Sequence, residues 1–311
     1  MAKEKIPVYN ISNLAARPLD PGEFMIEAFD AYLGRHSPNL HHAHRHSFYH
    51  LVYFTSGKGS HSIDFTSFPV EAGQVYFMTP GQVHSWNFEG VPKGYVVNFS
   101  EGFLKSFLLD ANYLDRFSFF SGNAMDSVVR LAGPVREKVA GLLGEMAEEY
   151  RASMTEEYRA SAAEEYRASA AADLLRAQLV QLFLLVQSGI AVGKPALPAA
   201  VTQKQQVMGS FRKLLDQNYK TMRLPSEYAA MLFVTPNHLN VLSRDLLGRS
   251  AGEVIRDRVL LEAKRLLTNA GMTGAQIAGE LNFQDNSYFN RFFKKYEGVT
   301  PEEFRRKHVV K

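Results

Sequence analysis

The sequence predicts an α+β fold with an N-terminal antiparallel β-barrel, central long helices and a C-terminal all-α region that holds two helix-turn-helix motifs. Three observations predict it: short β-type runs separated by turn residues, then a helix-favouring stretch, then two amphipathic helix-turn-helix patterns. A length of 311 residues allows two or more domains. The expected boundaries are 1–133 for the barrel, 134–188 for the helices, 189–203 for a linker and 204–311 for the last region.

Short β-type runs between Glu23 and Ser100 predict the barrel. Turn signals rich in glycine or proline separate the runs, at Ser56-Gly57-Lys58-Gly59, Glu71-Ala72-Gly73 and Pro80-Gly81. Strands of this length and spacing are typical of a small antiparallel barrel. The expected strands cover residues 24–29, 48–55, 62–65, 74–78 and 95–99.

Histidine is concentrated in the predicted barrel. Of the ten histidines in the chain, His41, His42, His44, His46, His50, His61 and His84 lie there. On a strand, His44, His46 and His50 share one face because side chains alternate with a period of two. The segments His44-Arg45-His46 and Gly73 to His84 resemble the two motifs of cupin barrels, which line a central cavity with such residues.

The barrel has two candidate ligand chemistries. His44, His46, His50 and His84 supply four imidazoles for a divalent metal, although metal-binding cupins usually carry Glu in the place of His50. Alternatively, they are hydrogen-bonded histidines that line a polar pocket. Three aromatic residues can stack on a small organic effector or simply fill the core. The expected ligand-binding residues are His44, His46, His50, Tyr53, Tyr76, His84 and Trp86.

A long helix is expected from Pro134 to Gln187, ended by Ser188-Gly189. It contains three nearly identical copies of an eight-residue unit, at 148–155, 156–163 and 164–171. Eight residues rotate each copy by roughly 80°, so the tyrosines of the repeat cannot form one packing stripe. The repeat is then a solvated spacer, or it sets the position of an apolar seam that pairs with another helix. That seam consists of Leu175, Leu179, Leu182 and Val186.

Two helix-turn-helix patterns occupy the C-terminal region. In the second, Asn282 lies where a left-handed turn residue is needed, and Asp285 or Asn286 can cap the following helix. One side of that helix carries aromatic residues, and the other carries amides and cations. Amides can bind adenine, Arg can bind guanine and Lys neutralises phosphate, so this face fits the major groove of DNA. An ordinary solvated amphipathic helix is the alternative.

The second motif, together with Gly298-Val299-Thr300-Pro301, closely resembles that of AraC-type transcription regulators, and Leu224 to Arg244 resembles the first. Arg258 to Leu267 is similar to the helix that joins the two in that family. The resemblance implies that base-reading side chains lie early in each recognition helix. The expected DNA-binding residues are Asn237, His238, Asn240, Val241, Arg244, Asn286, Ser287, Asn290, Arg291, Lys294 and Lys295.

One position departs from the family pattern. Many members carry Arg where this chain has Val241, which can contact a thymine methyl group but cannot pair with guanine. The buried stripe of this helix is still expected at Leu239, Leu242 and Leu246. The resemblance further implies dimerisation near the central helix. It also implies that the barrel binds an organic effector without a metal, as sensory cupins of such regulators commonly do.

Composition agrees with an intracellular DNA-binding protein. Residues 201–311 hold 18 Lys and Arg against 11 Asp and Glu, whereas residues 1–200 hold 17 against 21. Cysteine is absent, no uninterrupted apolar run reaches the roughly 18 residues that span a membrane, and no signal peptide is evident. A cytoplasmic location is therefore expected.

We expect a non-enzymatic transcription regulator without a cofactor or membrane partner. Its expected partners are double-stranded DNA, a small-molecule effector, a second copy of the chain and, if it is an activator, RNA polymerase. The alternative is a metal-dependent cupin enzyme, or a metal sensor, fused to a DNA-binding domain.

Overall fold

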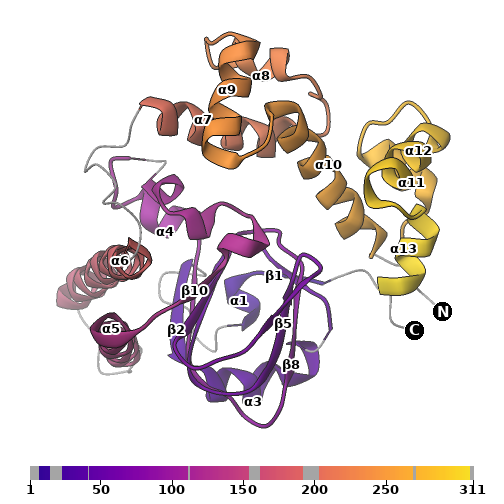
Figure 1. The fold of residues 1–311 in the computed structure, drawn as a ribbon. Helices are drawn as coiled ribbons and strands as arrows, with labels where there is room; N and C mark the ends of the chain where they lie inside the picture. Colours follow the sequence, from indigo (N-terminus) through magenta and orange to yellow (C-terminus); the bar gives the residue numbers. More distant parts are fainter. Residues whose placement is uncertain are drawn as a thin grey trace. The chain divides into compact units, whose positions relative to one another are not determined.

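The computed structural model describes residues 7–14, 23–40, 42–110, 113–153, 162–191, 203–268 and 271–308. They fall into two compact units, one within 7–197 and one within 198–311 (Figure 1). The first unit combines β-sheets with helices, and the second is entirely helical over its described residues. The predicted α+β class is therefore confirmed. The helices expected at 134–188 belong to the same compact unit as the sheets.

The first unit contains two antiparallel sheets and a short parallel pair. Its strands are β1 (Val8–Tyr9), β2 (Phe24–Ala28), β3 (Arg45–His46), β4 (Tyr49–Ser56), β5 (Gly59–Ile63), β6 (Thr66–Pro69), β7 (Gln74–Met78), β8 (His84–Phe88), β9 (Lys93–Phe99) and β10 (Val128–Arg130). One sheet has the order β10-β7-β4-β9-β2, the other the order β6-β5-β8, and β1 pairs with β3 in parallel.

The antiparallel strands of the predicted barrel are present, but the described strands form separate sheets that are not closed into one barrel. A tight turn lies at Asp64 and Phe65, which have φ values of 44° and 72°. This turn sends β6 directly back along β5, so the strands of the smaller sheet pair with one another. The strand expected at 62–65 accordingly ends at Ile63.

Strand residues alternate between two apolar cores, as a period of two requires. In β2, Phe24 and Ile26 face a core shared with long helices, whereas Met25 faces a core shared with the smaller sheet. In β4, Leu51 faces the first core and Val52 the second. The two sheets therefore face each other, with the larger one covered by helices on its other side.

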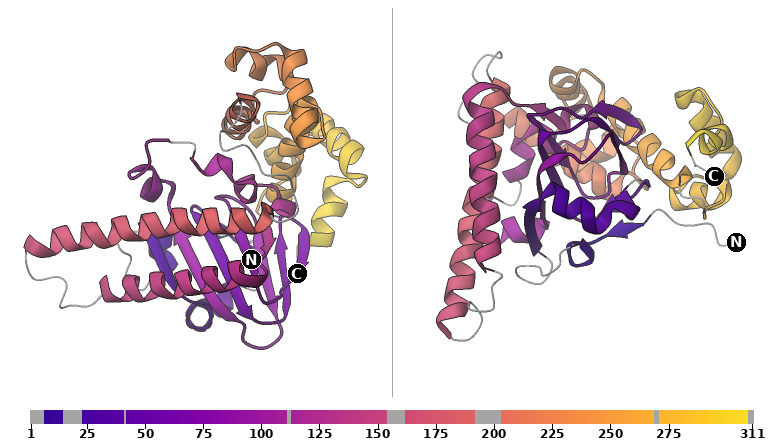
Figure 2. Two further views of the ribbon diagram at one scale, coloured as in Figure 1. Left: turned by 60° about the vertical axis from the view of Figure 1, so that its left-hand side comes forward. Right: turned by 90° about the horizontal axis from the view of Figure 1, so that it is seen from below.

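The helices of the first unit are α1 (Ile11–Leu14), α3 (Phe29–Leu40), α4 (Glu101–Lys105), α5 (Gly133–Ser153) and α6 (Ala162–Ala191). Short 3₁₀ turns lie between Tyr113 and Asp126. Figure 2 shows α5 and α6 side by side along the larger sheet. The single long helix expected from Pro134 to Gln187 is therefore wrong, because two helices are present in its place.

The two long helices run in opposite directions. A Cβ atom placed on Gly189, near the end of α6, would lie 3.3 Å from Val135 at the start of α5. The repeat thus extends from the end of α5 into the start of α6, and residues 154–161 lie outside the described residues. The Tyr150 ring of the first copy contacts Phe24 at 5.8 Å between centroids. The side chains of Tyr158 and Tyr166 lie outside the described ones.

The apolar seam predicted on the central helix is buried within the unit. Its four residues, Leu175, Leu179, Leu182 and Val186, are at most 1% exposed and pack against α5 and the larger sheet. The segment Ala170–Ile190 has a mean hydropathy of 1.3 over an 18-residue window, which matches a membrane-spanning helix by length and composition only. Its apolar face already has protein partners in the core.

The second unit consists of α7 (Gln203–Asn218), α8 (Pro225–Met231), α9 (Pro236–Leu247), α10 (Ala251–Leu267), α11 (Gly274–Glu280), α12 (Asn286–Glu297) and α13 (Pro301–His308). Helices α8 and α9 form one helix-turn-helix, and α11 and α12 form the other. Both predicted motifs are present. Each turn contains a residue of positive φ: Phe233 at 55° and Asn282 at 54°.

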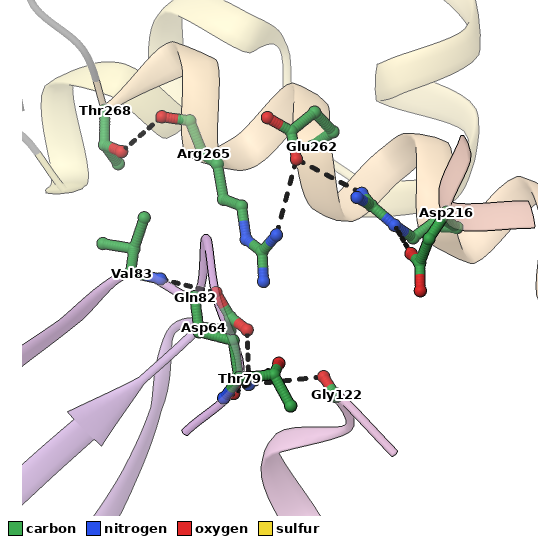
Figure 3. Close-up of polar contacts among 10 residues, drawn as sticks. Asp64, Thr79, Gln82, Val83, Gly122, Asp216, Glu262, Arg265 and Thr268 are labelled. Carbon is green, nitrogen blue, oxygen red and sulfur yellow. Dashed lines mark hydrogen bonds and ion pairs between the residues drawn. The ribbon is translucent and has the colours of Figure 1, made fainter. Parts of the chain in front are cut away.

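Helix α10 carries a buried polar network. Glu262 is 8% exposed and faces two guanidinium groups, those of Arg258 at 3.2 Å and Arg265 at 3.4 Å (Figure 3). Arg258 also binds Asp216 of α7 at 2.7 Å and lies over the ring of Tyr219 at 3.9 Å. This network ties α10 to α7. It therefore fixes the helix that packs against α9, α11 and α12.

Candidate DNA-binding surface and histidine cluster

Helix α12 presents a polar face that is fixed by its caps and its apolar side. The Asp285 carboxylate accepts a hydrogen bond from the Tyr288 backbone N–H at 2.6 Å, and Gly298 ends the helix in the left-handed conformation. The predicted capping by Asp285 is confirmed. Phe289 and Phe293 are fully buried, which turns the opposite side of the helix outward.

All six residues expected to bind DNA on α12 are exposed: Asn286, Ser287, Asn290, Arg291, Lys294 and Lys295. Two of these cations lie beside aromatic rings, Arg291 at 5.9 Å from the centre of Tyr288 and Lys295 at 5.2 Å from that of Tyr296. The face therefore offers amides, a hydroxyl group and three cations to a partner. This set can contact both base edges and phosphates.

Helix α9 is built in the same way. Thr235 caps it by accepting a hydrogen bond from the His238 N–H at 3.1 Å, and Gly248 ends it in the left-handed conformation. Leu239 and Leu242 are buried as predicted, but Leu246 is 41% exposed, so the expected stripe is shorter. Four of the expected contact residues are exposed: Asn237, His238, Val241 and Arg244.

Asn240 differs from the other expected contact residues. It is half-buried, and its side-chain oxygen accepts a hydrogen bond from the Ala251 backbone N–H at 3.0 Å. That N–H lies at the first turn of α10, where no partner within the helix is available. Asn240 therefore holds α9 against the start of α10, and only its amide nitrogen is left to donate to another group.

The histidines of the first unit come together between the two sheets. The isolated bridge between His44 and His84 consists of two backbone hydrogen bonds of 3.0 Å, and it brings their rings to 4.2 Å between centroids. The ring of His46 lies 5.0 Å from that of His44, 4.5 Å from His50 and 4.7 Å from His84. The predicted grouping of these four histidines is confirmed.

A polar network holds the loop that precedes His84. The Gln82 side-chain nitrogen donates to Asp64 at 3.0 Å and to the Gly122 carbonyl at 3.3 Å, and its oxygen accepts from Thr79 N–H at 2.8 Å (Figure 3). Asp64 also accepts from Val83 N–H at 3.1 Å. These bonds fix the backbone immediately before His84. The direction in which its ring enters the cluster is thereby set.

Burial keeps the histidines neutral. It lowers the pKa of His44 to about 4 and that of His50 to about 3, although the hydrogen bond that His50 donates to the Asn98 side-chain oxygen raises the pKa of His50. Burial also lowers the pKa of His46, His61 and His84 well below the usual value, and neighbouring histidines lower it further. At neutral pH each ring therefore offers one lone pair and one N–H.

The three aromatic candidates separate into two groups. Tyr76 and Trp86 lie in the core between the sheets, where Trp86 stacks on His61 at 3.4 Å between centroids. Tyr53 lies on the opposite face of the larger sheet, in the core beneath α5 and α6. It does not lie beside the histidines because it is three residues from His50, and an odd separation on a strand reverses the face.

Two further residues of the site were missed from the sequence. Asn98 on β9 lies directly opposite His50, and its side-chain oxygen is 2.5 Å from His50 Nδ1. His61 on β5 places its Nε2 atom 3.0 Å from His84 Nδ1. The sequence showed His61 as one of the clustered histidines. It did not show that the strand of His61 pairs with the strand of His84. Nothing in the local sequence singles out Asn98.

Comparison with known families identifies both units. A model of the AraC-like ligand binding domain matches residues 28–184, and a model of a helix-turn-helix domain matches residues 228–307. The chain belongs to the AraC family of regulators. The AraC-like match covers the sheets and both long helices, and the helix-turn-helix match runs from α8 to α13.

Similar proteins match about a third of this chain. The uncharacterized transcriptional regulatory protein YesN of Bacillus subtilis (strain 168) is 35% identical over 106 residues, which are 32% of this chain and 28% of YesN. The arabinose operon regulatory protein of Escherichia coli (strain K12) is 34% identical over 92 residues, 30% of each chain. The matched segments thus cover less than a third of either relative.

Solved structures of the family are more distant. The crystal structure of ToxT from Vibrio cholerae O395 aligns with 85% of this chain and 91% of its own, at 14% identity and a TM-score of 0.43. The C-terminal domain of the response regulator yesN from Fusobacterium nucleatum aligns with 32% of this chain, at 22% identity and a TM-score of 0.30.

Proposed function

We propose that the chain is a sequence-specific DNA-binding transcription regulator controlled by a small effector bound in its N-terminal unit. The observation that carries the proposal is the pair of capped helices α9 and α12, whose outer faces combine amides with cations. Membership of the AraC family supports it. The named regulatory role of the arabinose operon protein also favours a regulator over a metal-dependent enzyme.

The exposed side chains divide by chemistry. Asn286, Ser287 and Arg291 lie in the first turns of α12 and are proposed to contact base edges. Lys294 and Lys295 lie in its last turn and are proposed to contact phosphates with Asn290 beside them.

On α9, Asn237 and His238 are proposed to read bases, Val241 to contact a thymine methyl group and Arg244 to contact phosphate. Val241 is 52% exposed, so its side chain is available for such a contact. Asn240 has a mainly structural role, because its oxygen is bonded to α10. It can still donate one hydrogen bond to DNA from its amide nitrogen.

The effector is proposed to bind between the two sheets, beside the buried histidines, Tyr76 and Trp86. Rings and imidazoles together can hold a small ligand by stacking and by hydrogen bonds. To regulate, the effector must bind one conformation of the protein more tightly than another. We place this regulation in the cytoplasm, with RNA polymerase as a further partner if the chain activates transcription.

A second copy of the chain is proposed to bind the outer face of α6. This face is defined by exposed residues that recur at every third or fourth position of the helix: Leu174, Ala177, Gln181, Leu184 and Ser188. This 3,4 spacing matches a coiled-coil seam, and its leucines are 46% and 53% exposed. The expected dimerisation near this helix would therefore use a different face from the seam predicted on it.

Selection of bound sequences from random DNA tests the function. The full chain is expected to enrich one motif and to bind it at least about a thousandfold more tightly than scrambled DNA at physiological salt. The affinity should also fall steeply as salt rises, because phosphate contacts release counterions. Binding of both DNAs within a factor of about ten would contradict sequence-specific regulation.

A further inference from the structure

We propose that His44, His46 and His84 bind one divalent ion of the first transition series, with His50 beside it. One ligand nitrogen from each of the three lies within 4.8 Å of the others, and all three residues are buried. The sequence left hydrogen-bonded histidines as the simpler interpretation. The ring nitrogens that these hydrogen bonds leave unpartnered favour a metal ion instead.

His44, His84 and His50 each have one anchored ring nitrogen and one unpartnered ring nitrogen, whereas neither nitrogen of His46 is anchored. His44 Nδ1 donates to the His42 carbonyl at 2.9 Å, and His84 Nδ1 lies 3.0 Å from His61 Nε2. His44 Nε2, His84 Nε2 and both nitrogens of His46 are buried without a hydrogen-bond partner among the described residues. His50 repeats the pattern, with Nδ1 on Asn98 and Nε2 unpartnered.

His44, His84 and His50 match the arrangement of metal-binding histidines, and His46 lacks the second anchored nitrogen. Such residues almost always use one ring nitrogen for the ion and donate from the other to a carbonyl, carboxylate or similar group, which fixes the tautomer. Because a carbonyl can only accept, the neutral ring of His44 carries its proton on Nδ1 and its lone pair on Nε2. The lone pair therefore lies on the side of the cluster.

The chemistry of the donors selects the class of ion. Imidazole nitrogen suits Zn²⁺, Fe²⁺, Ni²⁺ and Cu²⁺, whereas Mg²⁺ and Ca²⁺ prefer oxygen. The rings are neutral at pH 7, so no protonated form must be displaced first. Bonds of about 2.1 Å require ligand nitrogens closer than 4.8 Å, so small ring rotations must accompany binding.

Metal analysis of the full chain tests the proposal. Protein without an affinity tag is stripped with a chelator, incubated separately with Zn²⁺ or Co²⁺, and desalted. About one ion per chain is expected by mass spectrometry of the metal, and the Co²⁺ form should show visible absorption bands of a four- or five-coordinate site. A content below about 0.1 ion per chain without such bands would overturn it.

Variants assign the ligands. His46→Gln and His84→Gln are expected to weaken Zn²⁺ binding at least about a hundredfold in competition with a chromogenic chelator. His42→Gln is the matched control, because its side chain is exposed while its carbonyl, which anchors His44, is kept. If the ligand variants fail to fold by circular dichroism, the wild-type stoichiometry and cobalt spectrum decide. Unchanged affinity in a folded ligand variant would contradict the assignment.

His61 is a positioning residue for this site. His61→Phe keeps an aromatic ring against Trp86 but removes the nitrogen that holds His84. Binding should weaken by about 10- to 100-fold, as for other groups that orient metal ligands, with shifted cobalt bands and a stoichiometry still near one. Identical affinity and bands would exclude this role. These outcomes do not depend on DNA binding, so failure of either proposal leaves the other intact.

Discussion

At the scale of single residues, the two helix-turn-helix turns adopt the same left-handed backbone conformation with different side chains. Both contain a left-handed residue, Phe233 in the first and Asn282 in the second. Asn tolerates this conformation, whereas an aromatic residue is strained in it. Packing of the Phe233 ring does not offset this strain, because the residue is 96% exposed.

Phe233→Asn should therefore stabilise the second unit. The expected gain is about 0.5–1 kcal/mol in the free energy of unfolding, from relief of backbone strain without loss of buried contacts. Chemical denaturation measures it. Asn282→Ala is the control in the equivalent turn and should lose about 1 kcal/mol. A loss of stability in Phe233→Asn would show that the aromatic ring has a stabilising partner.

Base reading and phosphate contact can be separated at two neighbouring residues of α12. Arg291→Ala should lose discrimination at one base step by about 1–3 kcal/mol. Lys294→Ala should weaken binding to all sequences alike and reduce the salt slope by about one. Titration of selected and scrambled DNA at several salt concentrations measures both. Equal losses on the two DNAs for Arg291→Ala would refute its role in base reading.

At the scale of elements, α10 depends on one buried carboxylate. Glu262 is the carboxylate between Arg258 and Arg265, and the latter is 5% exposed. Glu262→Gln removes the negative charge but keeps the shape of the side chain. Two guanidinium groups then face each other in a buried setting, and breaking a buried pair typically costs about 3–5 kcal/mol.

Glu262→Gln is therefore expected to lower the free energy of unfolding of the second unit by about 3 kcal/mol. Denaturation followed by helical circular dichroism measures the change. Glu302→Gln is the matched control, because its ion pair with Arg305 has a separation of 3.9 Å and its side chain is 84% exposed. That change should stay within about 0.5 kcal/mol. Equal effects would mean that the network contributes little.

The helices of the second unit were predictable because their signals are local. Asp285, Asn282 and Gly298 mark the cap, the turn and the end of α12 within a span shorter than twenty residues. The sheets were less predictable. The turn at Asp64 and Phe65 uses an aromatic residue at positive φ, which carries no turn signal in the sequence, so the pairing of β5 with β6 was missed.

In the histidine cluster too, local sequence patterns did not reveal which strands pair. His44, His46 and His50 were grouped by the period of two of a single strand, but the structure divides them between an isolated bridge, β3 and β4. Asn98 was missed because its position opposite His50 depends on the register of β9 with β4, which joins residues 48 positions apart. Tyr53 was grouped with Tyr76 and Trp86 by its aromatic side chain, but the period of two places it on the other face of the strand.

At the scale of the whole molecule, the break between α5 and α6 changes the meaning of the repeat. In one continuous helix, an insertion of 16 residues would move the later seam by about 24 Å and turn it by about 160°. In two antiparallel helices, added residues instead lengthen both helices where they are joined. The buried seam of α6 can then keep its contacts with the larger sheet.

The exposed face of α6 leads to a prediction about assembly. The double change Leu174→Glu and Leu184→Glu places a charge at two leucines that are about half exposed in the single chain. Neither belongs to the buried core of the first unit. The folded chain should therefore keep its thermal stability as a monomer, while a dimer that pairs these faces would be disrupted by like charges brought together.

Analytical ultracentrifugation of the wild type and the double variant measures this directly. The wild type is expected to sediment as a dimer, and the variant at least about tenfold more weakly associated. A dimer presents two recognition units to two half-sites. In the variant, the affinity for a full operator should therefore fall because dimerisation is weakened, while the affinity for a half-site stays unchanged. The matched control is Gln181→Glu, which adds one charge at a position on the same face that is already polar. A dimer that survives the double change would place the interface on another surface, and the spacing of half-sites would then be set by elements other than α6.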